Sequence, residues 1–246
     1  MAIIKNGKIH GRIGNYVYRV VNGMEIIQSY PRRTKQAGKA TLGNKRFGLS
    51  SKMSSKIYSI AKEFALHSID GTFYGELMAF IKSNFYSDQS IVEEEDYRTW
   101  KGVPFDRFWS INKGPTIQQI LKYPPQTHMI EGIIRVQFPR IEWRNSSNKY
   151  IQRANYFSYS VILIHYDFET GQARNVFEFN SERRLKNKEY EQEDYEIRLE
   201  DLNYPIENGL LMICYGLRFF EMKDSYGYIN SKKFNPCGVL GVWYKR

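Results

Sequence analysis

Cysteine is scarce in this sequence, and long apolar runs are missing from it. Only Cys214 and Cys237 occur, too few for a disulfide-stapled secreted scaffold, so we expect two reduced thiols and leave one structural disulfide open. The absence of any apolar run of about 18 residues excludes a predicted membrane-spanning helix. The N-terminus lacks the apolar stretch of a signal peptide. We therefore expect a cytoplasmic protein, or one incorporated into a particle assembled in the cytoplasm.

Acidic residues are almost missing from the first 56 positions, where Glu25 is the only one. The same stretch holds twelve lysines and arginines, which give it a net charge of +11 within a chain whose total is +10. The remaining residues are therefore almost neutral. Charge segregated in this way indicates an anionic partner, such as nucleic acid, an acidic protein surface or anionic lipid.

The motifs of common catalytic and metal sites are also missing. The glycines near the N-terminus lack the Gly-Lys-Ser/Thr sequence or the following helix that a phosphate-binding loop requires. The acidic runs at 93–96 and 189–194 lack the alternating ligands of a calcium loop, and each indicates either a solvated face or an acidic docking site for the basic segment of another copy. The histidines have no metal-ligand spacing; they are His10, His67, His128 and His165. We predict no metal, no cofactor and no enzymatic activity, with a hydrolase cleft near residues 97–128 as a remote alternative.

A few reactive or aromatic side chains can be placed by their neighbours. Cys214, inside an apolar run, is expected to be a buried small hydrophobe. Cys237, in Asn-Pro-Cys-Gly, is expected in a turn where it could be exposed and reactive. His165, at the end of an apolar run, is expected to be a hydrogen-bonded strand residue. The tryptophans are expected to be core or interface anchors; they are Trp100, Trp109, Trp143 and Trp243.

Two apolar runs near the N-terminus flank Asn22-Gly23. Asn-Gly tolerates positive φ at both central positions of a type I′ turn, so the pattern predicts a β-hairpin, with strands at Tyr16–Val21 and Met24–Tyr30. The preceding residues 1–14 are expected to be extended, with glycines that allow close backbone approach.

Helical periodicity follows a linker at residues 31–40, which is rich in charge and contains proline and glycine. The first predicted helix has Thr41 as its N-cap and ends near Asp70-Gly71. The second begins after Thr72, and the two form a helical hairpin. The apolar stripe of the first helix is Leu49, Met53, Ile57, Ile60 and Phe64, and that of the second is Phe73, Leu77, Phe80 and Ile81.

The second half of the chain has the pattern of β-structure. Runs of apolar residues are separated by turn residues without a long helix between them, which predicts an antiparallel sandwich. We expect an α+β protein with an N-terminal basic arm with a β-hairpin (1–40), a helical and irregular region (41–128) and a β-sandwich domain (129–246). A short helix is predicted at 116–122. The expected strands cover 133–138, 156–168, 173–179, 195–199, 209–222 and 239–244.

The basic N-terminal segment is the strongest functional signal. We favour a non-enzymatic structural or assembly protein, in which this segment docks on a neighbouring subunit or partner of a multi-subunit, for example phage-like, particle. The alternative is nucleic-acid binding, with the cations on phosphates and the tyrosines stacked on bases. Incidental surface charge is a third reading. The candidate binding residues are Lys5, Lys8, Arg12, Tyr16, Tyr18, Arg19, Arg32, Arg33, Lys35, Lys39, Lys45 and Arg46.

The N-terminal segment also carries a series of short motifs. They are Ile4-Lys5-Asn6-Gly7, Gly11-Arg-Ile-Gly14-Asn15-Tyr-Val-Tyr, Asn22-Gly23 and Ser29-Tyr-Pro31-Arg-Arg, followed by a helical segment. This pattern resembles an uncharacterised family common in Bacteroidota, over about residues 4–65. The chain departs from it at Gly11–Ile13, where such proteins often have a Gly-Lys pair with small residues. Because the family has no assigned activity, the resemblance implies a group of organisms and carries over no functional residue.

Overall fold

The computed structural model divides the chain into two compact units, Met1–Gly43 and Asn44–Arg246, and each is described by itself. The fold is α+β, as predicted from the sequence: an N-terminal β-hairpin region and two long helices precede antiparallel sheets that form a sandwich. The structure describes residues 2–5, 7–21, 24–29, 38–65, 69–86, 100–103, 109–112, 114–144, 149–185, 192–221 and 235–245.

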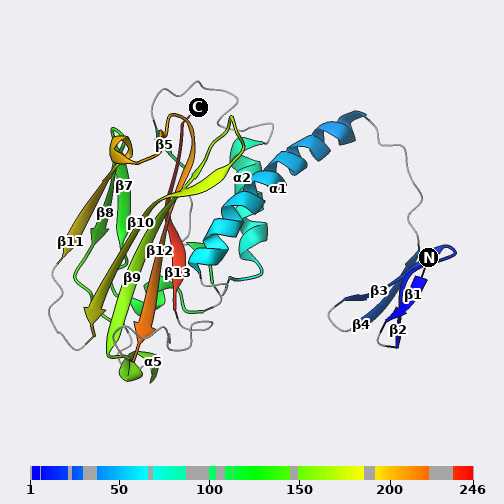
Figure 1. Ribbon diagram of the computed structural model, residues 1–246, viewed down its shortest axis with the longest axis horizontal. Coiled ribbons are helices and arrows are strands. Elements are labelled where there is room, and N and C mark those ends of the chain that lie inside the picture. Colours follow the sequence, from blue (N-terminus) through cyan, green and yellow to red (C-terminus); the bar gives the residue numbers. More distant parts are fainter. Residues whose placement is uncertain are drawn as a thin grey trace. The chain divides into compact units, whose positions relative to one another are not determined.

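The N-terminal unit contains a four-stranded antiparallel sheet in the order β1-β2-β3-β4. The predicted hairpin is confirmed as β3 and β4, although its turn, Asn22-Gly23, lies outside the described residues. Residues 2–13 form a second hairpin, so this region is more regular than predicted. The strands, labelled in Figure 1, are β1 (Ala2–Lys5), β2 (Lys8–Ile13), β3 (Tyr16–Val21) and β4 (Met24–Ser29).

Two glycines of this sheet, Gly7 and Gly14, lie in its turns. Gly7 has φ of 73° and Gly14 has φ of 56°, the left-handed region in which glycine avoids a steric cost. No atom lies within 4 Å of the place where a Cβ would stand on either residue. The expected role in close backbone approach is therefore wrong for these two glycines, because turn geometry is what requires them.

Two helices follow, α1 (Gly38–Phe64) and α2 (Phe73–Phe85). Helix α1 begins before Thr41, so this residue lies in the first turn and not at the predicted N-cap. Leu49 is 49% exposed, whereas the prediction placed it on the buried stripe. Thr72 is the N-cap of α2, without a side-chain capping bond. The rest of the predicted stripes is buried or half-buried: Met53, Ile57, Ile60 and Phe64 on α1, and Phe73, Leu77, Phe80 and Ile81 on α2.

Aromatic contacts join the two helices. The Tyr58 ring of α1 lies 6.3 Å from that of Phe73 and 5.4 Å, edge to face, from that of Tyr74 on α2. The Ser51 and Tyr74 hydroxyls are hydrogen-bonded at 3.1 Å. The predicted helical hairpin therefore forms, with apolar rings at its centre.

The body of the molecule contains two antiparallel sheets. The large sheet has the order β10-β9-β12-β13-β5, with β6 also paired to β13, and the small sheet has the order β11-β8-β7. The bounds of the large sheet are β5 (Lys101–Gly102), β6 (Trp109–Ser110), β9 (Tyr156–Tyr166), β10 (Ala173–Arg184), β12 (Gly209–Phe220) and β13 (Cys237–Lys245). Those of the remaining elements are α4 (Ile117–Ile120), β7 (Gln126–Ile130), β8 (Ile133–Phe138), α5 (Lys149–Arg153), β11 (Glu193–Arg198) and the 3-10 helix η1 (Leu199–Asp201).

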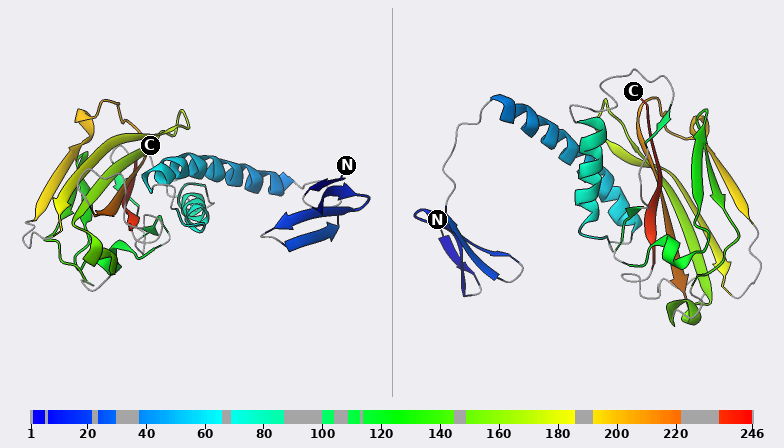
Figure 2. Two further views of the ribbon diagram at one scale, coloured as in Figure 1. Left: turned by 60° about the horizontal axis from the view of Figure 1, so that its bottom comes forward. Right: turned by 180° about the vertical axis from the view of Figure 1, so that it is seen from behind.

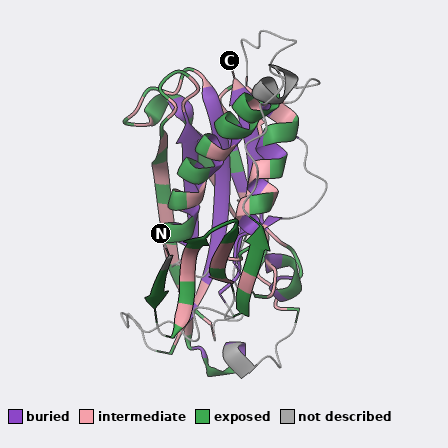
Figure 3. Cartoon of the chain, turned by 90° about the vertical axis from the view of Figure 1, so that its right-hand side faces the viewer, coloured by how far each residue is buried: buried purple, intermediate pink, exposed green. Residues whose placement is uncertain are grey.

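The large sheet lies in the middle of three layers (Figure 2). Helices α1 and α2 cover one face, where Ile57 and Leu77 join a cluster with Ile162 and Met212 of the sheet. The small sheet covers the other face. There, Ile134 joins a second cluster with those residues of β9 and β12 whose side chains point away from the helices. Strands β9 and β12 are therefore buried on both faces, which explains their nearly continuous apolar sequences (Figure 3).

Polar contacts join the small sheet to the large sheet at two places. On one side, the Thr127 hydroxyl of β7 donates to the Leu240 carbonyl of β13 at 3.1 Å. On the other, Arg183 of β10 donates to Glu193 of β11, whose carboxylate also accepts from the Tyr159 hydroxyl. Burial, followed by the bond to Glu193, raises the pKa of Tyr159 to about 12. Tyr159 is therefore a protonated donor at neutral pH, and the cluster joins the two sheets.

The compact units have one boundary, after Gly43, whereas the sequence predicted two, near residues 40 and 128. The second predicted boundary does not separate compact units. Residues of α1 and α2 share their core with the large sheet. The helical segment and the sandwich are therefore parts of one packed body.

Strand β10 is the outer strand of the large sheet. It is twelve residues long and carries Arg174, Glu178, Glu182, Arg183 and Arg184. A register shift between Asn175 and Phe177 marks a bulge near its start. Charge and bulges on an outer strand hinder the addition of a further strand.

Candidate functional site

The structure divides the predicted binding residues between the two units. Lys5, Lys8, Arg12, Tyr16, Tyr18 and Arg19 lie in the N-terminal sheet, and Lys39, Lys45 and Arg46 lie on α1. Lys45 and Arg46 belong to the body and Lys39 to the N-terminal unit. Arg32, Arg33 and Lys35 lie outside the described residues. The residues that the structure brings together are thus the six in the sheet.

The strand register assigns the aromatic and basic residues of β3 to opposite faces. Tyr16 and Tyr18 alternate with Arg19 along the strand, and Tyr18 pairs with Ile27 of β4. Arg19 pairs with Ile26. Because directly paired residues share a face, one face of this hairpin is aromatic and uncharged around Tyr18, whereas the other carries Arg19.

Two cations of the sheet have partners within it. The Lys8 ammonium lies 3.9 Å from the Glu25 carboxylate, with both side chains well exposed, so this pair adds little stability. The Arg12 Nε donates to the Gly14 carbonyl, which lies in the β2–β3 turn, at 2.8 Å. The sheet therefore keeps its positive charge at the surface, with only Glu25 to offset it.

Exposed apolar side chains are the most unusual feature of this sheet. None of its described residues between positions 3 and 29 is buried. Large apolar patches of this kind typically mark interaction surfaces. Its exposed large hydrophobic residues are Ile3, Ile4, Ile9, Ile13, Tyr16, Val21, Met24 and Ile27.

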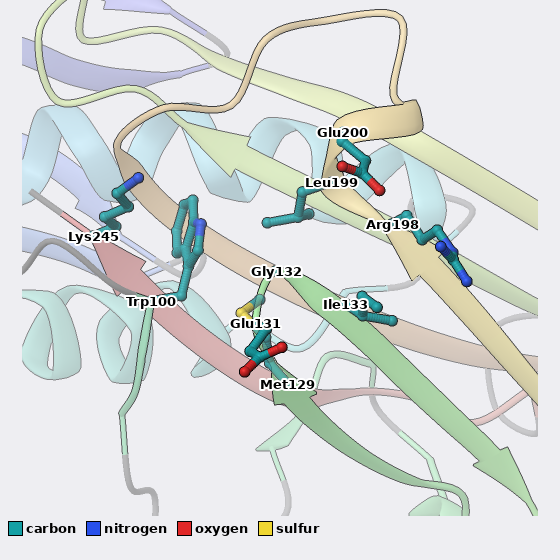
Figure 4. Close-up of a pocket in the computed structure, with 9 residues that line it drawn as sticks. All are labelled: Trp100, Met129, Glu131, Gly132, Ile133, Arg198, Leu199, Glu200 and Lys245. Atoms are coloured by element: carbon teal, nitrogen blue, oxygen red, sulfur yellow. The ribbon is translucent and has the colours of Figure 1, made fainter.

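A pocket of about 520 Å³ opens in the body, at one end of the sandwich (Figure 4). Trp100 precedes β5, Glu131 lies in the β7–β8 turn, Glu200 lies on η1, and Lys245 ends β13. No sequence motif marks this pocket, because its walls come from four segments that lie far apart in the chain. Its only local signal is Glu131-Gly132 between two apolar runs.

A second hollow, of about 420 Å³, lies between the end of α1 and strands β9 and β10. Its lining includes Glu63 and Glu178 and also Arg174 and Arg218. The Arg218 guanidinium donates to the Phe64 carbonyl at 3.2 Å, so this arginine fastens the end of α1 to the sheet. The balanced charges and this contact indicate a packing feature.

Both cysteines are buried thiols. Cys214 is buried as expected, and burial raises its pKa above its usual range. Cys237 begins β13 and is also buried, with a raised pKa, so the expectation of an exposed, reactive turn thiol is wrong. Pairing of β13 with β12 and β6 encloses the residue.

His165 is a strand histidine, as expected. It is buried on β9, with its Nε2 2.6 Å from the Asn208 carbonyl. Burial lowers its pKa, and the bond to Asn208 partly opposes that effect. The neutral ring thus donates a hydrogen bond to the carbonyl of Asn208, the residue before β12. His165 therefore has a structural role, because it links β9 to the start of β12.

The described part of the chain contains no cluster of three or more potential metal ligands. Among the helices of the described residues, none is long and apolar enough to cross a membrane. No protein-family model, curated protein or solved structure matches this chain. A function must therefore be argued from the chemistry of its own surfaces.

Proposed function

We propose that this chain is a non-enzymatic assembly protein whose N-terminal sheet docks on a neighbouring subunit of a multi-subunit, phage-like particle. The observation that supports the proposal most directly is the sheet that buries none of its described side chains between positions 3 and 29. A sheet gains stability when its hydrophobic face is covered, and the apolar residues of this sheet stay exposed to solvent. A neighbouring subunit supplies that packing.

The apolar residues provide the binding energy. Burying one exposed isoleucine or methionine fully is worth about 1.5–3 kcal/mol, and eight large hydrophobic residues are exposed here. We expect burial of these residues at a contact to offset the costs of association.

The outer strands and the charge decide how the sheet docks. Strands β1 and β4 are the edges of the sheet, and an edge strand adds to an open sheet through backbone hydrogen bonds. The cations accelerate the encounter with an acidic surface. We therefore expect assembly to weaken at high salt and to require the apolar residues.

Two isoleucines of equal exposure provide a matched test. Ile27 of the N-terminal sheet is 60% exposed and Ile130 of the body is 58% exposed. Light scattering after size-exclusion chromatography should show oligomers for the native chain and for Ile130→Glu. Ile27→Glu should be shifted to monomers, because a carboxylate cannot be buried at the contact without a partner. A native chain that stays strictly monomeric at high concentration would count against assembly.

Nucleic-acid binding is the second candidate, and the surface cations with Tyr16 and Tyr18 favour it. The register supports it less, because Arg12 and Arg19 lie on the face opposite Tyr18, so a nucleic-acid strand stacked on this tyrosine would not meet them. The absorbance ratio at 260 and 280 nm of protein purified without nuclease would reveal bound nucleic acid. If about six cations meet phosphates, affinity should fall about 10³-fold between about 50 and 200 mM salt.

A further inference from the structure

The pocket at the end of the sandwich is built from fixed strand pairing. Lys101 pairs with Tyr244 and Gly102 with Trp243, so Trp100 stands beside Lys245 at the end of β13. The Leu199 amide donates to the Gly132 carbonyl at 3.0 Å, which ties η1 to the β7–β8 turn. The elements that carry the pocket walls are therefore joined by backbone hydrogen bonds.

Apolar side chains form the inner wall. Trp100 and Met129 are half-buried and pack on the core between the two sheets, and Leu199 belongs to that core. In Figure 4 the indole ring of Trp100 stands between Lys245 and Leu199. An indole ring presents a flat, electron-rich face, which is suited to the C–H groups of a flat ligand.

Charged side chains form the rim. Glu131 and Glu200 supply carboxylates, while Arg198 and Lys245 supply donors. Arg198 also approaches the Glu196 carboxylate of its own strand at 3.5 Å. The rim thus has two acidic and two basic groups, so it favours no ligand of high net charge.

Glu131 adopts a backbone conformation that costs energy. Its φ is 49° and that of Gly132 is 79°, and the flanking Ile130 and Ile133 are paired. These values define a type I′ turn, in which asparagine or glycine is favoured at the first position. A non-glycine residue held at positive φ beside a pocket is a reason to ask what its side chain does there.

We propose that this pocket binds a neutral saccharide. A sugar ring has one face of C–H groups for the Trp100 indole and hydroxyls that both donate and accept hydrogen bonds. The carboxylates of Glu131 and Glu200 accept from hydroxyls, and Lys245 donates to them. The pocket volume of about 520 Å³ lies within the range of small-molecule sites and accommodates one or two sugar rings.

Other ligand classes fit this pocket less well. A nucleotide would bring several negative charges to a rim whose two carboxylates offset its two cations, so the rim supplies no excess of positive charge for them. A divalent cation needs several converging oxygen ligands, and the described residues hold no such cluster. A wholly apolar ligand would leave the rim charges without water or partners.

The probes are uncharged trisaccharides: maltotriose, cellotriose, mannotriose and N,N′,N″-triacetylchitotriose. Binding to the full chain is measured by isothermal titration calorimetry and by protein NMR shifts. At least one probe should bind at millimolar concentration or better. Trp100→Ala should weaken it about tenfold or more, as expected for the loss of one good aromatic contact, whereas Trp100→Phe should retain part of the affinity.

Glu131→Asn separates a ligand role from a structural one. Asparagine tolerates positive φ, so this variant should have a higher thermal midpoint than the native chain and yet bind the sugar more weakly. Tyr123→Ala, an exposed aromatic before β7 and at the opposite end of that strand from the pocket, should leave binding unchanged. The proposal is overturned if no probe binds, or if binding survives both Trp100→Ala and Glu131→Asn unchanged.

Discussion

The N-terminal sheet and the body both contain β-strands with many apolar residues, but the two regions differ in how far these residues are buried. In the body, β9 and β12 lie between two layers, and almost all of their residues are buried. In the N-terminal sheet, no described residue between positions 3 and 29 is buried. Apolar strands are thus used for stability in one region, while in the other they remain at the surface, where we propose that they bind a partner.

This contrast implies that the two regions respond differently to mutation. A side chain in the body contributes to the free energy of unfolding through packing. A side chain of the N-terminal sheet has little packing to lose, so its substitution should act on assembly. All four tryptophans lie between positions 100 and 243, so tryptophan fluorescence reports on the body alone.

The largest difference is expected for two isoleucines. Ile213→Ala removes a side chain that is 0% exposed on β12 and should lower the free energy of unfolding of the body by about 2–5 kcal/mol. Ile27→Ala, on the N-terminal sheet, should change it by less than about 0.5 kcal/mol. Urea unfolding followed by tryptophan fluorescence measures both. Equal losses would mean that the two units unfold as one, and the comparison would fail.

Two glycines of the body should respond in opposite ways to substitution by alanine. Gly209 has φ of 120°, and a Cβ there would lie 2.2 Å from the Tyr166 carbonyl oxygen. Gly209→Ala should therefore cost about 2–3 kcal/mol. Gly75 lies within α2 with no atom near its Cβ position, so Gly75→Ala should stabilise by up to about 1 kcal/mol. Thermal and urea unfolding of both variants would show opposite shifts, and shifts of the same sign would contradict this account.

The smallest expected effect is a pH dependence that belongs to the body. Burial lowers the pKa of His165, while Asp167 acts to raise it and Arg174 to lower it. Below about pH 6.5 the unfolded chain binds a proton at this position that the folded chain resists, so stability should fall as the pH falls. The slope from this group cannot exceed about 1.4 kcal/mol per pH unit.

Urea unfolding between about pH 7.5 and 5 measures this slope. His165→Gln should lower stability at pH 7.5 but flatten the decline at lower pH. This range lies above the usual titration of Asp167, whose pKa is lowered because its bonds to Thr170 and to nearby backbone amides outweigh burial. An unchanged slope in the variant would show that other groups cause the decline.

Local patterns in the sequence predicted much of this fold. Asn-Gly predicted the β3–β4 hairpin, and helical spacing predicted the buried face of α2. The first hairpin was missed although Asn6-Gly7 carries the same turn signal, because β1 is short. Leu49 was misplaced because the buried face of α1 at this point runs through the small polar residues Ser50 and Ser54, which an apolar periodicity does not detect.

Features that depend on distant contacts could not be predicted. Strand β7 has no alternating pattern, and it is a strand because it pairs with β8 and because Thr127 bonds to Leu240. The pocket walls around Trp100 and Glu131 meet only after the sheets pair. Cys237 follows a proline and precedes a glycine, yet strand pairing buries it. The charge of the N-terminal segment was visible in sequence, but the opposite faces of Tyr18 and Arg19 required the register.

The charged outer strand β10 has a consequence for how copies of the chain could polymerise. An edge that rejects incoming strands protects the body from the open-ended stacking that leads to fibrils. Contacts between copies are then left to the N-terminal sheet, which has two open edges, β1 and β4. The geometry of docking at this sheet would decide whether the copies close into a ring or continue as an open chain.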